Sequence, residues 1–318
     1  MKNNLEDIPF TEVCDENGKS YNEFRKGLTP HFHRVRNDII GGWACLILIL
    51  IIAIVMQKEG WLSWTSVLIG SLLLGYNLAY IQLFIHEAAH YNIHRDRLWN
   101  DRISDYLIGV FSGISMKRYR KIHWQHHQQL GSTKDSEHSY YNTLNIVFLI
   151  KSLVGIQALS TILDRKSKLN DEKTQASKVA WFYIYVFFFH LTLLFILFFL
   201  GGWKVVSMWL IGLVSIFPLF GALRQLLEHR DINAPSKANF ANINHGKLSR
   251  LFSNNLIDRS FGAAGFNRHL IHHWDPLISY TRLQDVETFL SHCPQTSETI
   301  KESKTTYFKT FIRLFKFK

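Results

Sequence analysis

Four long apolar stretches constrain the fold of this chain more than any other feature. A transmembrane helix needs roughly 20 consecutive, predominantly apolar residues. The stretches that meet or approach this length are residues 39–56, 61–85, 179–200 and 203–223. They are joined in pairs by very short connections, residues 57–60 and 201–202. Because such connections leave no room for another element, the sequence predicts two helical hairpins that cross a membrane.

The distribution of Lys and Arg predicts the orientation of these hairpins. Six basic residues precede the first stretch, fourteen lie in residues 86–178 and fourteen lie from residue 224 onward. The two that remain, Lys58 and Lys204, belong to the hairpin turns. Basic segments stay on the cytoplasmic side of a membrane, so we expect both termini to be cytoplasmic. A membrane surface therefore explains the net charge of +11 better than a nucleic acid does.

Nine of the 16 histidines form a pattern, and all nine lie in segments predicted to be cytoplasmic. Eight form three clusters, HEAAH at 86–90, HWQHH at 123–127 and HLIHH at 269–273, and His229 stands between the last two. Spacings of three and four residues bring side chains to one face of a helix. His94 would extend the face of the first cluster by one more turn, although we do not count it as a ligand. The nine candidate ligands are His86, His90, His123, His126, His127, His229, His269, His272 and His273.

Nine imidazoles are too many for one metal ion and about right for two. Imidazole suits zinc, copper, iron and nickel alike, so the ligand type alone does not identify the metal. HEAAH also matches the HExxH pattern of zinc proteases, in which Glu87 would be the general base. A zinc protease needs only one further ligand and leaves the other clusters unexplained. A non-catalytic metal carrier or lipid-binding protein is a third alternative.

The motifs resemble those of the membrane fatty acid desaturase and hydroxylase superfamily. That family carries a first HxxxH motif, two HxxHH motifs and one intermediate histidine, matched here by residues 86–90, 123–127, 269–273 and His229. The flanking residues are similar too. A polar run ending in Asp135 follows the second motif, and Asn267 begins the NxH that opens the third. The resemblance covers about residues 38–285.

The resemblance implies an all-α integral membrane protein. Four transmembrane helices in two hairpins would stand under a helical cytosolic cap that carries the histidines. Nine histidines would hold two iron ions (Fe²⁺), and O2 would be used to remove hydrogen from an unactivated C–H bond. Loss of a second hydrogen gives a double bond in a fatty acyl chain or lipid, whereas oxygen rebound gives a hydroxylated product. Because no HPGG-type haem-binding stretch occurs, electrons are expected from a separate ferredoxin or cytochrome b5-like protein.

Further polar residues are candidates for orienting the imidazoles. By resemblance, Gln225 stands where family members can carry a polar residue bound to iron through water. Carboxylates commonly accept a hydrogen bond from the second nitrogen of a metal-bound imidazole. The carboxylates near the clusters are Glu87, Asp135, Glu228, Asp231 and Asp275, and Asn267 is a further candidate. For each carboxylate, a surface ion pair with Lys or Arg is the alternative.

Outside the four stretches, the sequence predicts three flanking features. Residues 1–37 form a cytosolic N-terminal segment, and residues 286–318 form a basic C-terminal tail. The end of this tail, residues 308–318, mixes aromatic and basic residues, so we expect it to lie on anionic headgroups, a disordered tail being the alternative. The weaker apolar stretches 106–116 and 146–162 predict helices in the membrane interface or in the core of the cap.

Overall fold

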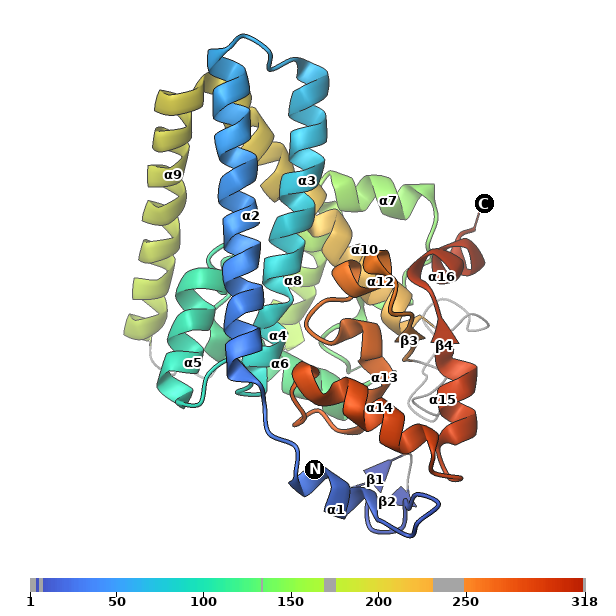
Figure 1. Cartoon of the computed structure of the whole chain (residues 1–318). Coiled ribbons are helices and arrows are strands. Elements are labelled where there is room, and N and C mark those ends of the chain that lie inside the picture. The colour runs from blue at the N-terminus through green and yellow to red at the C-terminus, as the bar shows by residue number, and fades with distance from the viewer. Residues whose placement is uncertain (1–3, 6–7, 133, 169–175, 231–248, 317–318) are drawn as a thin grey trace. The chain divides into compact units, whose positions relative to one another are not determined.

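Helices account for most of the fold (Figure 1). The computed structural model describes residues 4–5, 8–132, 134–168, 176–230 and 249–316. Among these residues the strands are four segments of two residues each, so the prediction of a mainly helical chain is confirmed. Contacts divide the chain into two compact units. We name them the apolar unit (residues 36–123 and 146–223) and the polar unit (residues 1–35, 124–145 and 224–318).

The apolar unit contains the long helices. The elements are α2 (Phe32–Lys58), α3 (Trp64–Gln82), α4 (Phe84–Ala89), α5 (Arg97–Ile103), the π-helical turn η1 (Ser104–Gly109), α6 (Met116–Gln129), α7 (Ile146–Leu153), α8 (Ile156–Lys168), α9 (Ala176–Ile211), the π-helical turn η3 (Gly212–Ile216) and α10 (Phe217–His229).

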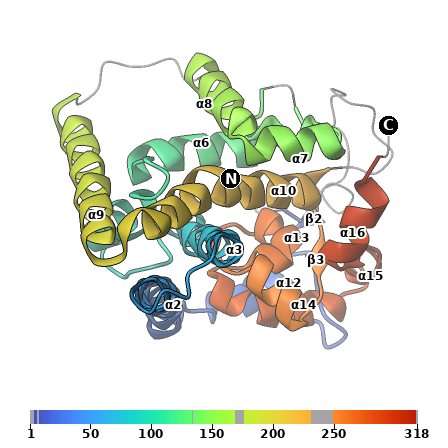
Figure 2. The same ribbon diagram turned by 90° about the horizontal axis from the view of Figure 1, so that it is seen from above.

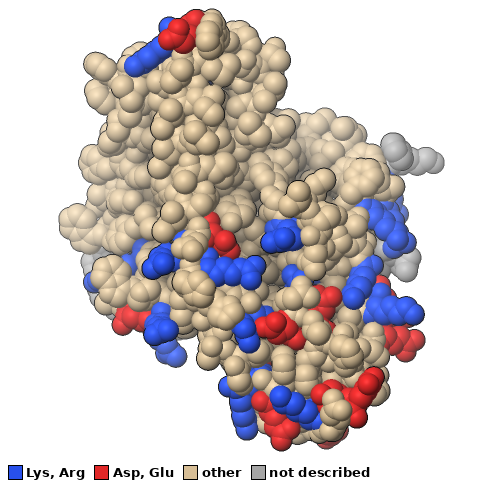
Figure 3. All heavy atoms as spheres, in the orientation of Figure 1, with Lys and Arg blue, Asp and Glu red and all other residues tan. Residues whose placement is uncertain are grey.

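Three helical runs are long and apolar enough to cross a membrane. They are Phe32–Lys58, Trp64–Ala89 and Ala180–His229, and a fourth candidate is the pair α7 and α8, bent by 80° at its break. The first two runs contain most of the predicted spans 39–56 and 61–85. Figure 3 shows that the surface over α2 and α3 carries almost no charged residues between the two ends of these helices. These runs are in keeping with a membrane protein.

The predicted spans 179–200 and 203–223 fall within one run of 50 residues that is broken at a glycine. Gly202 has φ 65° and ψ −172°, outside the helical region. A positive φ of this size suits glycine because other residues have a Cβ that clashes. The ribbon turns at this point (Figure 1). Lys204 Nζ donates a hydrogen bond to the Leu62 carbonyl at 2.7 Å, so this turn lies against the turn between α2 and α3.

Helix α3 packs closely against its neighbours because small residues line its contacts. A Cβ on Gly75 would lie 2.4 Å from Cβ of Ile216, and one on Gly212 would lie 2.5 Å from a methyl group of Leu74. The Ser71 hydroxyl donates to the Met208 carbonyl at 3.1 Å. Figure 2 shows α2 beside α3 when the helices are seen from above. This packing fixes the position of α3, which continues toward the first histidine cluster.

The polar unit is built from short helices around a compact core. Its elements are β1 (Asn4–Leu5), β2 (Ile8–Pro9), α1 (Tyr21–Lys26), the 3-10 turn η2 (His138–Tyr141), β3 (Leu251–Phe252), α12 (Leu256–Phe261), the 3-10 turn η4 (Phe266–Arg268), α13 (His269–Trp274), the 3-10 turn η5 (Tyr280–Arg282), α14 (Leu283–Ser291), α15 (Ser297–Ser303), β4 (Lys304–Thr305) and α16 (Tyr307–Leu314). Strands β1 and β2 pair antiparallel, and β3 and β4 pair parallel.

Helix α13 lies at the centre of the polar unit. Leu270, Ile271 and Trp274 belong to the buried apolar core together with residues of the N-terminal segment and α14. The remaining positions of the helix are His269, His272 and His273, which are also buried. The core thus holds the backbone that carries the third histidine cluster.

Candidate metal centre

The apolar unit brings His86, His90 and His123 together. His86 lies in α4, His90 follows the last residue of that helix, and His123 lies in α6. Nε2 of His90 is 2.8 Å from Nε2 of His123, and the His86 and His123 ring centroids are 4.4 Å apart. One nitrogen of each ring lies within 4.8 Å of one nitrogen of the other two. We name these three residues the HEAAH-side set.

The backbone that carries this set is braced by side chains on α5 and α6. Arg120, one turn before His123, donates to the carbonyls of Ala88 and Ala89 at 3.0 Å each and forms an ion pair with Asp101. Asn100 Nδ2 donates to the same Ala88 carbonyl at 2.9 Å. Carbonyls in the last turn of a helix have no intrahelical partner, so these bonds stabilise the end of α4.

The expectation that His94 extends the helical face of this set is wrong. Helix α4 ends at Ala89, and Tyr91 has a φ of 61°, so the chain leaves the helical path before it reaches His94. Nδ1 of His94 instead accepts a hydrogen bond from the backbone amide of Asp96 at 3.0 Å. His94 thus supports the start of α5.

The polar unit brings the other six candidate histidines together. Nε2 of His269 lies 2.8 Å from Nε2 of His229 and 3.2 Å from Nε2 of His273. Nε2 of His272 lies 3.1 Å from Nε2 of His127. One nitrogen of each of His126, His229 and His273 lies within 4.8 Å of the other two. We name the polar-unit set of six the HxxHH-side set: His126, His127, His229, His269, His272 and His273.

Asp135 is positioned to orient one imidazole of the HxxHH-side set. Its carboxylate oxygens lie 2.9 and 3.0 Å from Nδ1 of His126. The Tyr140 hydroxyl donates to the same carboxylate at 2.7 Å, and so does the backbone amide of Glu137 at 2.8 Å. Asp135 is fully buried. This is the arrangement in which a carboxylate fixes the tautomer and rotation of a metal-binding histidine.

Two more of the predicted supporting residues lie beside histidines of the sets. Glu87 has a carboxylate oxygen 3.7 Å from Nδ1 of His86. Glu228, the residue before His229, accepts a hydrogen bond from the Tyr307 hydroxyl at 2.9 Å and pairs with Arg224 at 3.4 Å.

The remaining predicted residues make other contacts. Nε2 of Gln225 donates to Glu137 at 3.1 Å, and Nδ2 of Asn267 donates to Asn254 at 3.4 Å. Asp275 receives two hydrogen bonds from Arg25, at 2.7 and 3.0 Å, and one from the Tyr21 hydroxyl at 3.0 Å. The ion-pair alternative therefore accounts for the contacts of Asp275. Asp231 lies outside the described residues.

Burial controls the protonation of this site. Burial, and next the neighbouring imidazoles, lower the pKa of His269 and of His273 well below the ordinary histidine value. Burial, and next the charge of Asp135, raise the pKa of Tyr140 above its ordinary value. The Tyr140 hydroxyl therefore keeps its proton and donates a hydrogen bond to Asp135. His269 and His273 are neutral near pH 7, which is the form that binds a metal.

The spacing of the imidazole nitrogens fits metal binding. Two nitrogen ligands, each about 2.1 Å from one ion, are about 3.0 Å apart at a right angle and about 3.4 Å apart at the tetrahedral angle. The Nε2–Nε2 distances within the two sets are 2.8 to 3.2 Å. Apart from His127, which is partly buried, the donors of both sets are buried, and imidazole can bind a metal through a neutral ring nitrogen. The donor sets therefore fit divalent transition metals.

Sequence reasoning missed several residues that support the sets. Tyr119 stacks on the His123 ring at 5.5 Å, and Phe266 stacks on His269 at 5.1 Å. Two sequence signals could have found them. Tyr119 lies one helical turn before His123 in α6, and Phe266 lies three residues before His269. Tyr140 and Tyr307 reach Asp135 and Glu228 from turns and helices whose placement no local pattern predicts.

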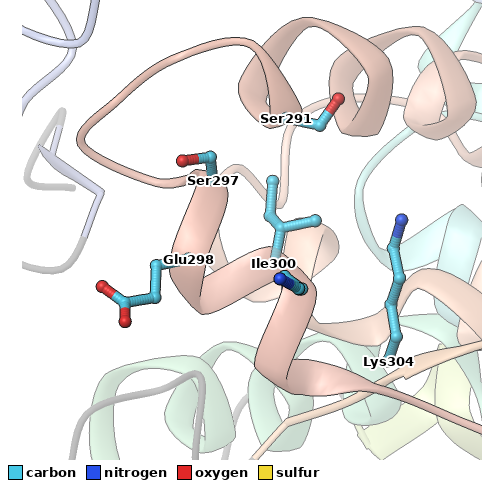
Figure 4. A pocket seen from close by; sticks show the side chains of 6 residues that line it. Ser291, Ser297, Glu298, Ile300 and Lys304 are labelled. Atoms are coloured by element: carbon cyan, nitrogen blue, oxygen red, sulfur yellow. The ribbon is translucent and has the colours of Figure 1, made fainter.

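A surface pocket of the polar unit contains none of these histidines. It has a volume of about 430 Å³ and lies between α14 and α15 (Figure 4). Its lining residues are Ser291, Ser297, Glu298, Ile300, Lys301 and Lys304. Chemistry at the histidines does not involve this pocket.

Comparison with known proteins identifies the family. No curated protein gives a significant match. The sequence model of the family described as "Fatty acid desaturase" matches residues 62–304, about three quarters of the chain. This range includes all nine candidate ligands and the helical runs from α3 to α15. The chain belongs to the fatty acid desaturase family.

Proposed function

We propose that this protein uses O2 and two iron ions to introduce a double bond into a fatty acyl chain or lipid. The observation that carries the proposal is the convergence of nine imidazoles into two sets within a chain of the desaturase family. Two iron ions bound there would supply the oxidising power that removes hydrogen from an unactivated C–H bond. Hydroxylation is the alternative outcome of the same chemistry.

The residues of the chain hold the imidazoles in the form that this chemistry needs. The N–H at Nδ1 of His126 would donate a hydrogen bond to Asp135, which leaves Nε2 of His126 for the metal. Tyr140 keeps Asp135 in place by donating a hydrogen bond from its hydroxyl to the second carboxylate oxygen. Arg120 holds the end of α4, so His86 and His90 keep their spacing. The carbon of the acyl chain that the protein holds next to the metal ions would be the one that is oxidised.

We further propose four membrane spans in two hairpins, under a cytosolic cap, within a catalytic domain of residues 38–285. A continuous helix of 50 residues would be about 75 Å long, more than twice the roughly 30 Å of a bilayer core. The break at Gly202 supports two crossings in the run Ala180–His229. The Lys and Arg distribution supports cytoplasmic termini and cytoplasmic histidines.

The partners follow from the same proposal. The substrate would be an acyl chain on CoA, on a carrier protein or in a complex lipid. Electrons would come from a separate ferredoxin or cytochrome b5-like protein. The basic surface of a net positive chain would suit acidic partners of either kind.

Product analysis tests the proposal. The full-length chain would be expressed in a host that supplies an electron donor, and the acyl chains of all lipid classes would be profiled. We expect a new unsaturated product and two irons per chain in the purified protein. His126→Ala should abolish the product, and His292→Ala, at an exposed histidine outside both sets, should not.

Each alternative gives a different result. A hydroxylated product in place of an unsaturated one would show that the protein is a hydroxylase and not a desaturase. One zinc per chain together with peptide cleavage would support the protease alternative. A product that persists in His126→Ala would refute the site itself.

A further inference from the structure

The polar unit exposes few large apolar side chains, and most of them lie on two helices. Among its described residues, five such side chains are at least half exposed: Leu256, Ile257, Leu277, Phe308 and Ile312. Four of the five lie on α12 and α16, with exposed fractions of 83%, 73%, 74% and 59%. Clustered exposure of this kind marks an interaction surface.

Helices α12 and α16 are held to each other by Tyr307. The backbone amide of Tyr307 donates to Asp258 at 3.1 Å, and the Tyr307 ring lies edge-on to Phe261 at 4.8 Å. Ile257 and Phe308 are the direct chain neighbours of Asp258 and Tyr307. Figure 1 shows the two helices at the same level, beyond the ends of β3 and β4. The two helices that carry the exposed pairs are therefore in direct contact.

The orientation of α16 is fixed by its buried face. Tyr307, Thr310 and Leu314 are buried at spacings of three and four residues, which place them on one side of the helix. Phe308 and Ile312, four residues apart, are exposed on another side. The apolar side chains therefore face outward because the packing of α16 holds them there.

The charged residues of α16 and the residues that follow it are all basic. Residues 304–318 include five Lys or Arg and no Asp or Glu. Lys309 and Arg313 of α16 are exposed, as is Lys316. Figure 3 shows Lys and Arg side chains over α16. A partner of this surface is therefore both apolar and anionic.

We propose that α12 and α16 form a second membrane-binding surface, which lies in the headgroup region of an anionic bilayer. Leu256, Ile257, Phe308 and Ile312 would enter the boundary of the acyl chains, and Lys309 and Arg313 would contact anionic headgroups. A helix with apolar and basic side chains exposed together is typical of an interfacial helix. The long apolar runs already hold this chain at a bilayer, so lipid is the partner that is always present.

This surface is connected to a histidine of the HxxHH-side set. Tyr307, on the buried face of α16, donates its hydroxyl to Glu228 at 2.9 Å, and Glu228 directly precedes His229. The buried face of α16 thus contacts the metal-site region while the exposed face contacts lipid. The inference stands on exposure and charge, so it does not depend on the metal.

Spin labels on the full-length chain test the proposal. In a background of Cys14→Ser, Cys45→Ser and Cys293→Ala, single cysteines would be placed by Ile257→Cys, Phe308→Cys and Ile312→Cys. Lys301→Cys, at an exposed position on α15, is the matched control. The labelled protein would be reconstituted in vesicles of phosphatidylcholine with phosphatidylglycerol. We expect the three test labels to be more accessible to O2 than to a water-soluble nickel chelate, and the control label to show the reverse.

A second experiment tests whether the basic side chains contribute to membrane binding. Lys309→Gln combined with Arg313→Gln should reduce the O2 preference of the label at Phe308 in vesicles with phosphatidylglycerol. The same pair should have little effect in phosphatidylcholine alone, where headgroups carry no net charge. An unchanged O2 preference in both vesicles would overturn the role of anionic lipid.

Two outcomes would overturn the proposal as a whole. Test labels as accessible to the nickel chelate as the Lys301→Cys control would place this surface in water. Labels shielded from both reagents, with broadening from label-to-label proximity, would show a second copy of the chain as the partner. Bound metal content, measured on each labelled variant, shows that the variant is folded.

Discussion

The two histidine sets differ in what holds their imidazoles. In the HxxHH-side set, a side-chain network supports a ring directly, since Asp135 bonds His126 and Tyr140 bonds Asp135. In the HEAAH-side set, Arg120 and Asn100 bond backbone carbonyls of α4. These hydrogen bonds thus support one set at a ring nitrogen and the other along the backbone of α4, and Tyr119 adds a stacking contact with the His123 ring. A change to the first should alter metal affinity, whereas a change to the second should alter folding as well.

Removing one ligand from each set gives the largest expected effect. His90→Ala and His229→Ala each delete a buried imidazole from a different set. We expect each variant to lose activity by more than about 100-fold, because a lost ligand disrupts the ion that supplies the chemistry. Metal content and product yield would be measured together. If two irons bind as proposed, each variant should lose about one of them.

The matched control is His292→Ala, because Nδ1 of His292 bonds the Thr288 carbonyl at an exposed position. It should keep both metal and activity. Full activity in His90→Ala or in His229→Ala would remove that histidine from the centre.

Asp135→Asn should weaken the HxxHH-side set by an intermediate amount. An amide cannot stabilise the His126 ring as a carboxylate does, and lost orienting partners typically cost about 10- to 100-fold in metal affinity or activity. The measurement is the metal dissociation constant together with product yield. Tyr140→Phe removes the hydrogen bond to Asp135 and the one that the Tyr140 hydroxyl accepts from the Gly131 amide. It leaves the carboxylate on His126 in place, so it should cost less, on the order of 1 kcal/mol. Equal losses in the two variants would contradict this hierarchy.

Arg120→Met should instead act on stability. It removes hydrogen bonds to Ala88 and Ala89 and the ion pair with Asp101. Buried carbonyls left without a donor cost about 1–3 kcal/mol each, although Asn100 still bonds Ala88. We expect a lower thermal midpoint, in detergent, than that of the parent. Lys121→Ala, at the exposed next position, should leave the midpoint unchanged. A normal midpoint with lost metal would mean that Arg120 acts on the ligands alone.

Histidine spacing made the two sets predictable, and local helix geometry was sufficient for this. HWQHH and HLIHH lie on α6 and α13 as the i, i+3 and i+4 pattern predicts. The prediction failed where the chain leaves a helix, because the positive φ of Tyr91 ends the face before His94. A histidine-rich motif therefore predicts that its own residues are helical, but it does not predict where the helix ends.

The supporting residues were predictable only where a local pattern or the family resemblance pointed to them. Asp135 follows its cluster closely, whereas Tyr307 reaches Glu228 from 79 residues away. Asp275 stands next to HLIHH in sequence, yet Arg25 and Tyr21 from the N-terminal segment bind it. The hydrogen-bond partners of these residues are determined by long-range packing within the polar unit and not by how close a residue lies to a histidine ligand in the sequence.

The smallest expected effect is a pH dependence in the apolar unit. Asp105 accepts a hydrogen bond from the backbone amide of Met116, the first residue of α6. Burial raises the pKa of Asp105 to about 6. The folded chain therefore binds the proton of the Asp105 carboxyl more tightly than the unfolded chain does. The stability that this protonation contributes is present at about pH 4 and is lost as the pH rises through about 6.

Asp105→Asn removes this charge and keeps an oxygen that can accept from Met116. Above pH 6 the variant should be more stable than the parent by on the order of 1 kcal/mol, a value reduced for partial exposure. The two proteins should become similar near pH 4. Thermal midpoints in detergent at both pH values would measure the difference. A variant less stable than the parent at neutral pH would show that the carboxylate, rather than its oxygen alone, holds the start of α6. The start of α6, the helix that carries His123, would then depend on the charge of Asp105. The HEAAH-side set would in that case also rely on a charged side chain, as the HxxHH-side set does on Asp135.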